Sequence, residues 1–240
     1  MLKKRLTKIL QTWVSPALTG EGFRKKNNVY GRRFGTMGWI IDVQWSPFKN
    51  SVKSEFTLNC GVYVAGVTSK YFNRPDSKQT QLTDCCIQSR VGMLNQSRTD
   101  KWWSLQASDE PITVDEIIGE DMHRRICSDC LPFLKRFTSL ENVLAFLITP
   151  RQFENKHVWP QSEAISLCFA ASIASQLGHP VESEKFIKNA TEKARGSPIE
   201  HVVLRMRDDL HTTQDRVKGK EKEITPINGQ GKGSDQRDQD

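Results

Sequence analysis

Residues 37–64 read MGWIIDVQWSPFKNSVKSEFTLNCGVYV, and this stretch decides how the chain folds. Apolar and polar side chains alternate through residues 39–45 and again through residues 56–64, which is the period of a strand with one buried face. The polar segment between the two runs most simply joins neighbouring strands in antiparallel order. We therefore expect an antiparallel pair whose apolar face is covered by a helix or a second layer.

Strand-like patterns on both sides of this pair extend the predicted sheet. They cover residues 29–34, residues 85–94 and a short run that begins at Trp102. Apolar residues at helical spacing predict a basic amphipathic helix over residues 2–14 and a long helix over residues 111–137, bent near Pro132. The sequence thus predicts an α+β domain, residues 1–137, in which an antiparallel sheet of four to five strands is packed on one side by the N-terminal and the long helix.

A small helical extension is expected over residues 138–211. Its helices are predicted at residues 140–148, 162–177, 181–194 and 199–210. The second and third resemble a single tetratricopeptide-type hairpin, but a free-standing solenoid needs about three repeats. We therefore expect the extension to pack against the preceding domain, and the tail 212–240, which is almost free of large apolar residues, to be disordered.

The net charge of +7 is concentrated at one end of the chain. Residues 1–34 contain nine Lys or Arg and one acid, so that the rest is about neutral. This asymmetry favours an acidic partner, whether nucleic acid, a protein or a membrane surface, although solvated faces of a helix and a strand would look the same.

The location and the redox state follow from what the sequence lacks. It has no apolar run of about 18 residues and no signal-peptide pattern, which predicts a soluble cytoplasmic protein without a membrane span. The six cysteines do not form the framework of a small secreted scaffold, so reduced thiols are expected.

Five motifs resemble a bacterial family known only as domain of unknown function 4304. They are GFRKKNNVYGRRFG (22–35), IIDVQWSPF (40–48), FTLNCGVYV (56–64), RVGML (90–94) before the WW of DKWWSL, and the helix end LPFL (131–134). The resemblance covers roughly the first 55 to 60% of the chain. It implies the α+β fold and a bacterial or phage origin, and it brings no established activity. Family members are associated with toxin and immunity systems, which is analogy alone.

No catalytic signature is present. The chain lacks a Gly-rich phosphate loop, a nucleophile elbow, an HExxH motif and the kinase motifs, so neither an enzyme nor a cofactor is expected. His123, Cys127 and Cys130 would share one face of the long helix, but a structural zinc site needs four ligands and small thiols on a helix are ordinary core residues. No metal site is predicted.

Two groups of side chains are candidate binding residues. The polar side of the sheet would present Asp42, Gln44, Thr57, Asn59, Tyr63 and Arg90, and a basic edge would present Arg24, Lys25, Lys26, Arg32 and Arg33. Amides, hydroxyls and charges can hydrogen-bond an extended partner segment or a polar ligand, and Trp102 or Trp103 is expected to cover part of this side. The alternative is a solvated face with internal hydrogen bonds.

The working hypothesis is a non-enzymatic, macromolecule-binding module of immunity type whose partner is another protein. The basic edge lies close to Tyr30 and Phe34, so a nucleic-acid-binding protein that neutralises phosphates and stacks bases is the alternative. An enzyme with an unrecognised site is the third possibility. The sequence does not predict the oligomeric state.

Overall fold

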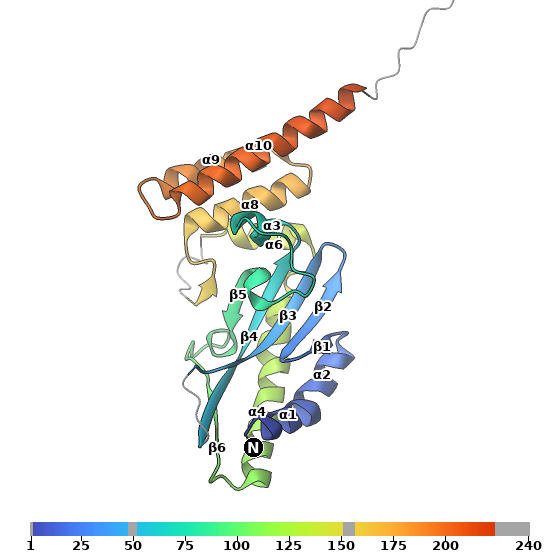
Figure 1. Cartoon of the computed structure of the whole chain (residues 1–240), viewed down its shortest axis with the longest axis vertical. Helices are drawn as coiled ribbons and strands as arrows, with labels where there is room; N and C mark the ends of the chain where they lie inside the picture. Colours follow the sequence, from blue (N-terminus) through green and yellow to red (C-terminus); the bar gives the residue numbers. More distant parts are fainter. Residues whose placement is uncertain (1, 48–51, 151–156, 224–240) are drawn as a thin grey trace, which may run out of the picture.

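The computed structural model describes residues 2–47, 52–150 and 157–223 (Figure 1). A single sheet lies in the middle, with helices behind it and at one end. The fold is α+β, as predicted.

Within the described residues the sheet has seven strands, and every neighbouring pair is antiparallel. The strands are β1 (Arg24–Lys26), β2 (Val29–Phe34), β3 (Met37–Trp45), β4 (Lys53–Val64), β5 (Cys85–Arg90), β6 (Trp103–Gln106) and β7 (Val158–Trp159). Their order is β1-β2-β3-β4-β5-β7, and β6 pairs with the first part of β4. The central pair is β3 and β4, which confirms the antiparallel pair expected from residues 37–64.

The sheet has more strands than the four to five predicted. β1 was missed because its three residues are all basic and exposed, so they show no apolar alternation. β7 was missed because it is only two residues long, and it comes from the segment predicted as a helical extension.

The predicted strand over residues 85–94 ends at Arg90, and Val91–Met93 forms a 3₁₀ turn, η3. A bulge opposite Val62 and Tyr63 also places Cys85 on the face opposite to Ile87, whereas regular alternation would place both on one face.

One face of the sheet, the core face, is covered by the N-terminal and the long helical segments. The first comprises α1 (Leu2–Ile9), the π turn η1 (Leu10–Val14) and α2 (Ser15–Gly20), and the second comprises α4 (Pro111–Arg125), the π turn η4 (Ile126–Cys130) and α5 (Leu131–Lys135). Leu6, Ile9, Met122 and Ile126 pack with Ile41 and its neighbours in one continuous core.

Each π turn comes just before a proline, Pro16 or Pro132. A proline inside a helix has no N–H for the carbonyl four residues earlier and its ring clashes with that carbonyl. The wider π turn accommodates the missing bond, so the predicted bend near Pro132 takes this form.

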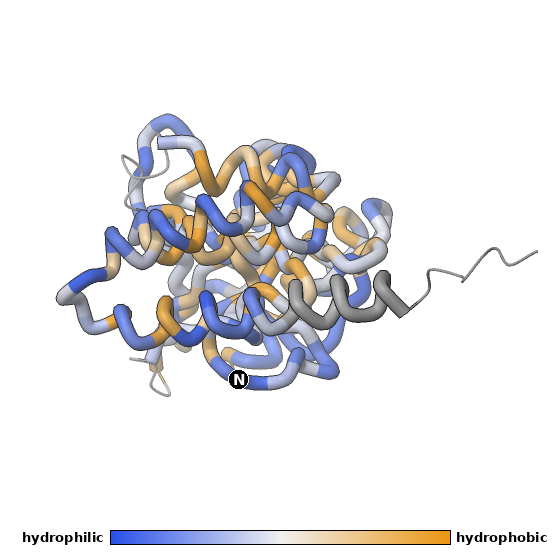
Figure 2. Tube along the Cα trace, turned by 90° about the horizontal axis from the view of Figure 1, so that it is seen from above, coloured by the Kyte–Doolittle hydropathy of each residue, from blue (hydrophilic) through white to orange (hydrophobic). Residues whose placement is uncertain are grey.

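The C-terminal part is helical and packs on the end of the sheet near α3 (Val67–Tyr71). It contains α6 (Leu140–Ile148), α8 (Glu163–Gln176), α9 (Pro180–Ala194) and α10 (Glu200–Glu223). In Figure 2 hydrophobic positions gather in the middle of the molecule and hydrophilic ones at its edge. Hydrogen bonds from Ser166 to the Leu147 carbonyl and from Ser183 to the Ala171 carbonyl fasten α8 to α6 and to α9.

Helix α10 continues to Glu223, past Thr212, where the disordered tail was predicted to begin. The tail was assigned from its lack of apolar residues, whereas an established helix can be extended by local propensity alone. Residues 224–240 lie outside the described part of the chain, so the prediction of disorder remains a prediction there.

Candidate functional site

The face of the sheet opposite to the core face carries the predicted polar residues, and we call it the polar face. The register places Asp42 opposite Asn59 and Asn59 opposite Arg90, so three strands contribute one row of polar side chains. Gln44 and Thr57 form the next pair along β3 and β4. The structure therefore brings five of the six predicted polar-face residues together.

Several of these side chains already have partners within the chain. The Asn59 amide donates to Gln44 Oε1 over 2.9 Å, and the fully buried Thr57 hydroxyl donates to the Lys101 carbonyl over 2.6 Å. Burial raises the pKa of Asp42, and its hydrogen bond with Asn59 opposes that rise. These contacts leave Thr57 unavailable to a ligand.

Arg90 contacts both an acidic and an aromatic side chain on the polar face. Its guanidinium forms an ion pair with Asp100 and lies 5.0 Å from the centre of the Trp102 ring. Asp100 also accepts from the Trp102 indole N–H over 2.9 Å. Trp102 is therefore the tryptophan beside the polar face, while Trp103 lies on the core face against Phe56.

A hollow of about 380 Å³ opens beside this row, and we call it the polar hollow. It is lined by Gln44, Asn59, Leu82, Gln88, Ser89, Arg90, Met93, His157, Trp159 and Gln161. Sequence reasoning missed the residues after 150, because they reach the sheet only through the short strand β7.

Tyr63, the sixth predicted residue, lies apart from the row. Its ring is almost completely buried beneath the Arg33 guanidinium, 4.0 Å from the ring centre, and packs with Ile40 and Cys85. Burial raises the pKa of Tyr63, and nearby Asp76 adds to the rise while Arg33 opposes it. Tyr63 thus supports Arg33 from below.

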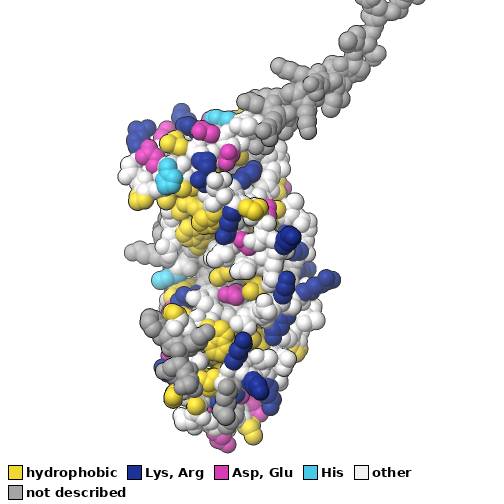
Figure 3. Space-filling model, in the orientation of Figure 1, with side chains coloured by type: hydrophobic (Ala, Val, Ile, Leu, Met, Phe, Trp, Pro, Cys, Tyr) yellow, Lys and Arg dark blue, Asp and Glu magenta, His cyan; other side chains and the backbone are white. Residues whose placement is uncertain are grey.

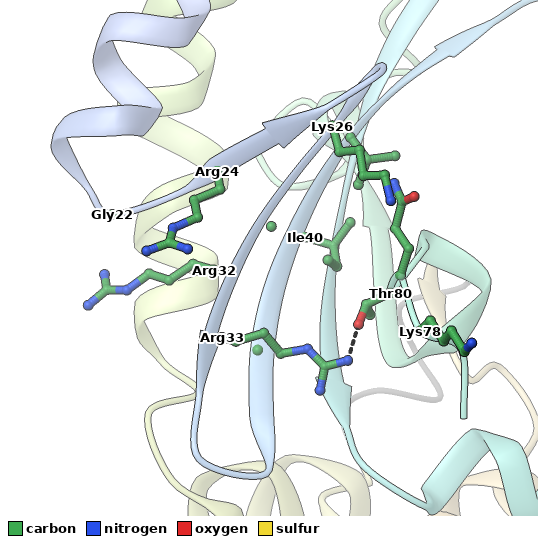
Figure 4. Close-up of a pocket in the computed structure, with 12 residues that line it drawn as sticks. Gly22, Arg24, Lys26, Arg32, Arg33, Ile40, Lys78 and Thr80 are labelled. Carbon is green, nitrogen blue, oxygen red and sulfur yellow. Dashed lines mark hydrogen bonds between the residues drawn. The ribbon is translucent and has the colours of Figure 1, made fainter. Parts of the chain in front are cut away.

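A second and larger hollow, of about 520 Å³, lies over β1, β2 and β3 (Figure 4), and we call it the basic hollow. Five cationic residues line it: Arg24, Lys26, Arg32, Arg33 and Lys78. The Arg32 guanidinium lies 5.0 Å from the centre of the Trp39 ring on the core-face side, so four cationic groups face the hollow. Its other lining residues are Gly22, Val29, Gly31, Gly38, Ile40, Gln79 and Thr80. None of the described lining residues carries a carboxylate.

The basic hollow is open because two glycines, Gly31 and Gly38, face it from the sheet. Gly31 lies between Arg24 and Ile40, its partners in the neighbouring strands on the polar face. Gly38 on β3 could not be larger, because a Cβ atom there would lie 2.8 Å from the Arg32 carbonyl oxygen. The guanidinium of Arg33 points across the hollow and donates to Thr80 Oγ1 (Figure 4).

The predicted basic edge is divided between the two faces of the sheet. Lys25 lies opposite Tyr30 on the core-face side, 5.4 Å from the ring centre, and does not line the basic hollow. Lys78 lines the basic hollow in place of Lys25. The sequence did not predict this position, since no strand pattern fixes the path of residues 65–84. Figure 3 shows basic side chains along this side of the sheet.

The model of the family described as Domain of unknown function (DUF4304) matches residues 14–136, just over half of the chain. The chain belongs to this family. The DUF4304 part contains the whole basic hollow, whereas His157, Trp159 and Gln161 of the polar hollow lie outside it. No curated protein and no solved structure matches the chain.

Among the described residues no three His, Cys, Asp or Glu side chains form a group that could hold a metal ion. None of the described helices has the length and apolar composition needed for a membrane crossing.

Proposed function

We propose that this DUF4304 member is a non-enzymatic binding module that holds an acidic segment of another protein in the basic hollow. The observation that carries the proposal is that four cationic side chains, Arg24, Lys26, Arg33 and Lys78, face the hollow without a carboxylate among the described lining residues. Like charges gathered in a hollow repel one another, and an anionic occupant relieves that repulsion.

The chemistry of the hollow favours carboxylates on a peptide over a nucleic acid. Arginines such as Arg24 and Arg33 can bind a carboxylate with two parallel hydrogen bonds. Single-stranded nucleic acid is held largely by bases stacked on aromatic rings, and the described lining contains no aromatic residue. The amides of the polar hollow, Gln44 and Gln88, can hydrogen-bond the backbone of the same extended segment.

The partner binds with a strong dependence on salt. Each exposed ion pair contributes only about 0.2 to 1 kcal/mol, so affinity requires several pairs at once. The family's association with toxin and immunity systems supports one form of this proposal, in which the acidic partner is a toxin.

The test uses a fluorescently labelled oligoglutamate peptide and the full chain, at about 50 and about 200 mM salt. The double variant Arg24→Glu with Lys26→Glu should abolish binding. The matched control is Lys185→Glu with Lys188→Glu, which changes the net charge equally at exposed positions on α9 and should bind as the wild type does.

Single-stranded and duplex oligonucleotides are titrated in parallel. If an oligonucleotide binds through Arg24 and Lys26 and the peptide does not, the partner is a nucleic acid and the proposal is wrong. Absence of binding by every probe, or equal losses in both double variants, also overturns it.

A further inference from the structure

A cysteine and a histidine meet at the surface where α4 passes into η4, beside η1. Cys127 Sγ lies 3.8 Å from His123 Nε2. Both residues are exposed, and His123 Nδ1 lies 3.1 Å from the Trp13 carbonyl oxygen. This pair is independent of both hollows.

The neighbour of His123 Nδ1 decides which ring nitrogen carries the proton. A carbonyl oxygen can only accept a hydrogen bond, so the neutral imidazole holds its proton on Nδ1 and donates it to Trp13. The lone pair of Nε2 then points toward the Cys127 thiol. A nucleophile, a base and a group that orients the base are the three components of an activated thiol.

The π turn η4 separates Cys127 from Cys130, although regular helical spacing predicted both on one face with His123. Cys130 is buried beside Cys60, whose hydrogen bond, together with burial, raises the pKa of the Cys130 thiol. Cys127 is instead left on the solvent side with its histidine.

The other cysteines make Cys127 distinctive. All six lie within the described residues, and only Cys127 is exposed. Burial raises the pKa of Cys86 and of Cys168 to about 12, so neither forms a thiolate at neutral pH. A reagent in solution therefore meets one accessible thiol, and that thiol has a base beside it.

We propose that Cys127 is a modification site that forms a mixed disulfide with a low-molecular-weight disulfide, with His123 as the base. The thiol proton passes to His123 Nε2, and the Cys127 sulfur attacks one sulfur of the disulfide. A new S–S bond forms as the old one breaks. The departing sulfur keeps the bonding electron pair and takes the proton from the imidazolium, so Cys127 is oxidised and the departing thiol is reduced.

The mixed disulfide is the end product. An internal resolving thiol would have to reach Cys127, but each of the other five cysteines is buried. A small disulfide is the suitable reagent because Cys127 lies at the surface and is reached directly from solvent.

The expected acceleration is modest. A free cysteine is only a few per cent thiolate at pH 7. A base that removed the proton from every thiol would therefore raise the rate of mixed-disulfide formation by at most about 30-fold. A more acidic thiol is also a weaker nucleophile. We therefore expect Cys127 to react about three to ten times faster than an unassisted thiol at pH 7.

The test incubates the full chain with glutathione disulfide and follows the intact mass, with the adduct located by peptide mapping. One adduct should form, on Cys127, and Cys127→Ser should form none. His123→Gln should slow the reaction to the rate of a free cysteine peptide, and added imidazole should restore part of the rate. His201→Gln, another exposed histidine, is the matched control and should react as the wild type does.

Two results overturn the proposal. One is a wild-type rate no higher than that of the free cysteine peptide, which needs no variant to fold. The other is an unchanged rate in a folded His123→Gln variant.

Discussion

Two aspartates of this chain lie in opposite electrostatic environments. Burial raises the pKa of Asp42 on the polar face, against the hydrogen bond with Asn59. Burial also acts to raise the pKa of Asp121 on α4, but hydrogen bonds from Lys101 and Trp103 and the charge of Arg125 hold it below its usual value. The protonated form is favoured at Asp42 and the ionised form at Asp121.

The two residues should therefore give opposite pH trends in stability. Asp42 contributes to the free energy of unfolding in full below the usual carboxyl pKa, and this contribution is lost as the pH rises through its raised pKa. Asp121 contributes above the usual carboxyl pKa, and its contribution is lost as the pH falls through its lowered pKa. Relative to the wild type, the free energy of unfolding of Asp42→Asn should rise between about pH 3 and about pH 7, and that of Asp121→Asn should fall. Urea unfolding at the two pH values measures both, and parallel trends would contradict the assignment.

Gly92 in η3 has no room for a side chain. A Cβ atom there would lie 2.2 Å from the Thr99 carbonyl oxygen and 2.5 Å from the Lys101 nitrogen. We expect Gly92→Ala to lower the free energy of unfolding by about 3 kcal/mol, which is the upper end of the usual cost of overpacking. Urea unfolding measures the loss. Gly20→Ala is the control, since no atom lies within 4 Å of that added Cβ, and it should change stability by no more than about 1 kcal/mol.

At the scale of residues, the sequence predicted what depends on local alternation. Asp42, Asn59 and Arg90 each lie on the polar side of their own strand because the period of a strand is two, and the antiparallel register then places the three in one row. The place of Lys78 in the basic hollow could not be predicted, because it depends on the path of a long connection. The meeting of His123 Nδ1 with the Trp13 carbonyl joins residues far apart in the sequence and left no signal in it.

At the scale of elements, η1 and α4 are in close contact on the core face. A Cβ atom at Gly119 would lie 2.1 Å from Cδ1 of Trp13. The two segments can come this close only because position 119 has no side chain.

We therefore expect Gly119→Ala to destabilise the chain by about 3 kcal/mol in the wild-type background. In a Trp13→Ala background the same change should be neutral or slightly stabilising, since alanine is the better helix former. Chemical denaturation of the four proteins gives the coupling energy. Equal effects in the two backgrounds would show that the ring does not limit the approach.

The helical segments also show where periodicity succeeds and fails. The existence of both segments followed from apolar spacing. The different faces of Cys127 and Cys130 did not follow from apolar spacing, because the π turn before Pro132 changes the direction in which the later side chains of the helix point.

At the scale of the whole molecule, α8 joins the sheet part to the C-terminal helices. Phe169 is fully buried, with its ring 5.5 Å from that of Tyr71 in α3. The Gln176 amide donates to the Ala65 carbonyl just after β4, and Arg205 of α10 donates to the Tyr71 carbonyl over 2.6 Å. The two parts therefore share one core.

Their unfolding should be a single transition. All six tryptophans lie outside α8, α9 and α10, so fluorescence reports mainly on the sheet part, while far-UV circular dichroism also follows these helices. We expect the two urea curves to coincide, and Phe169→Ala to lower both midpoints together, at a cost of about 3 to 5 kcal/mol. A variant whose circular dichroism midpoint falls while its fluorescence midpoint stays would show two independent units.

Strand β4 has two different neighbours along one edge, β6 beside Lys53–Phe56 and β5 beside Asn59–Tyr63. A residue inserted or deleted between these two stretches would turn one half of the strand over relative to the other, so that Leu58 (insertion) or Cys60 (deletion) would take the place of Asn59. Homologous sequences should therefore differ in length within residues 65–84 and keep β4 free of gaps, which makes this strand the fixed reference for aligning the family.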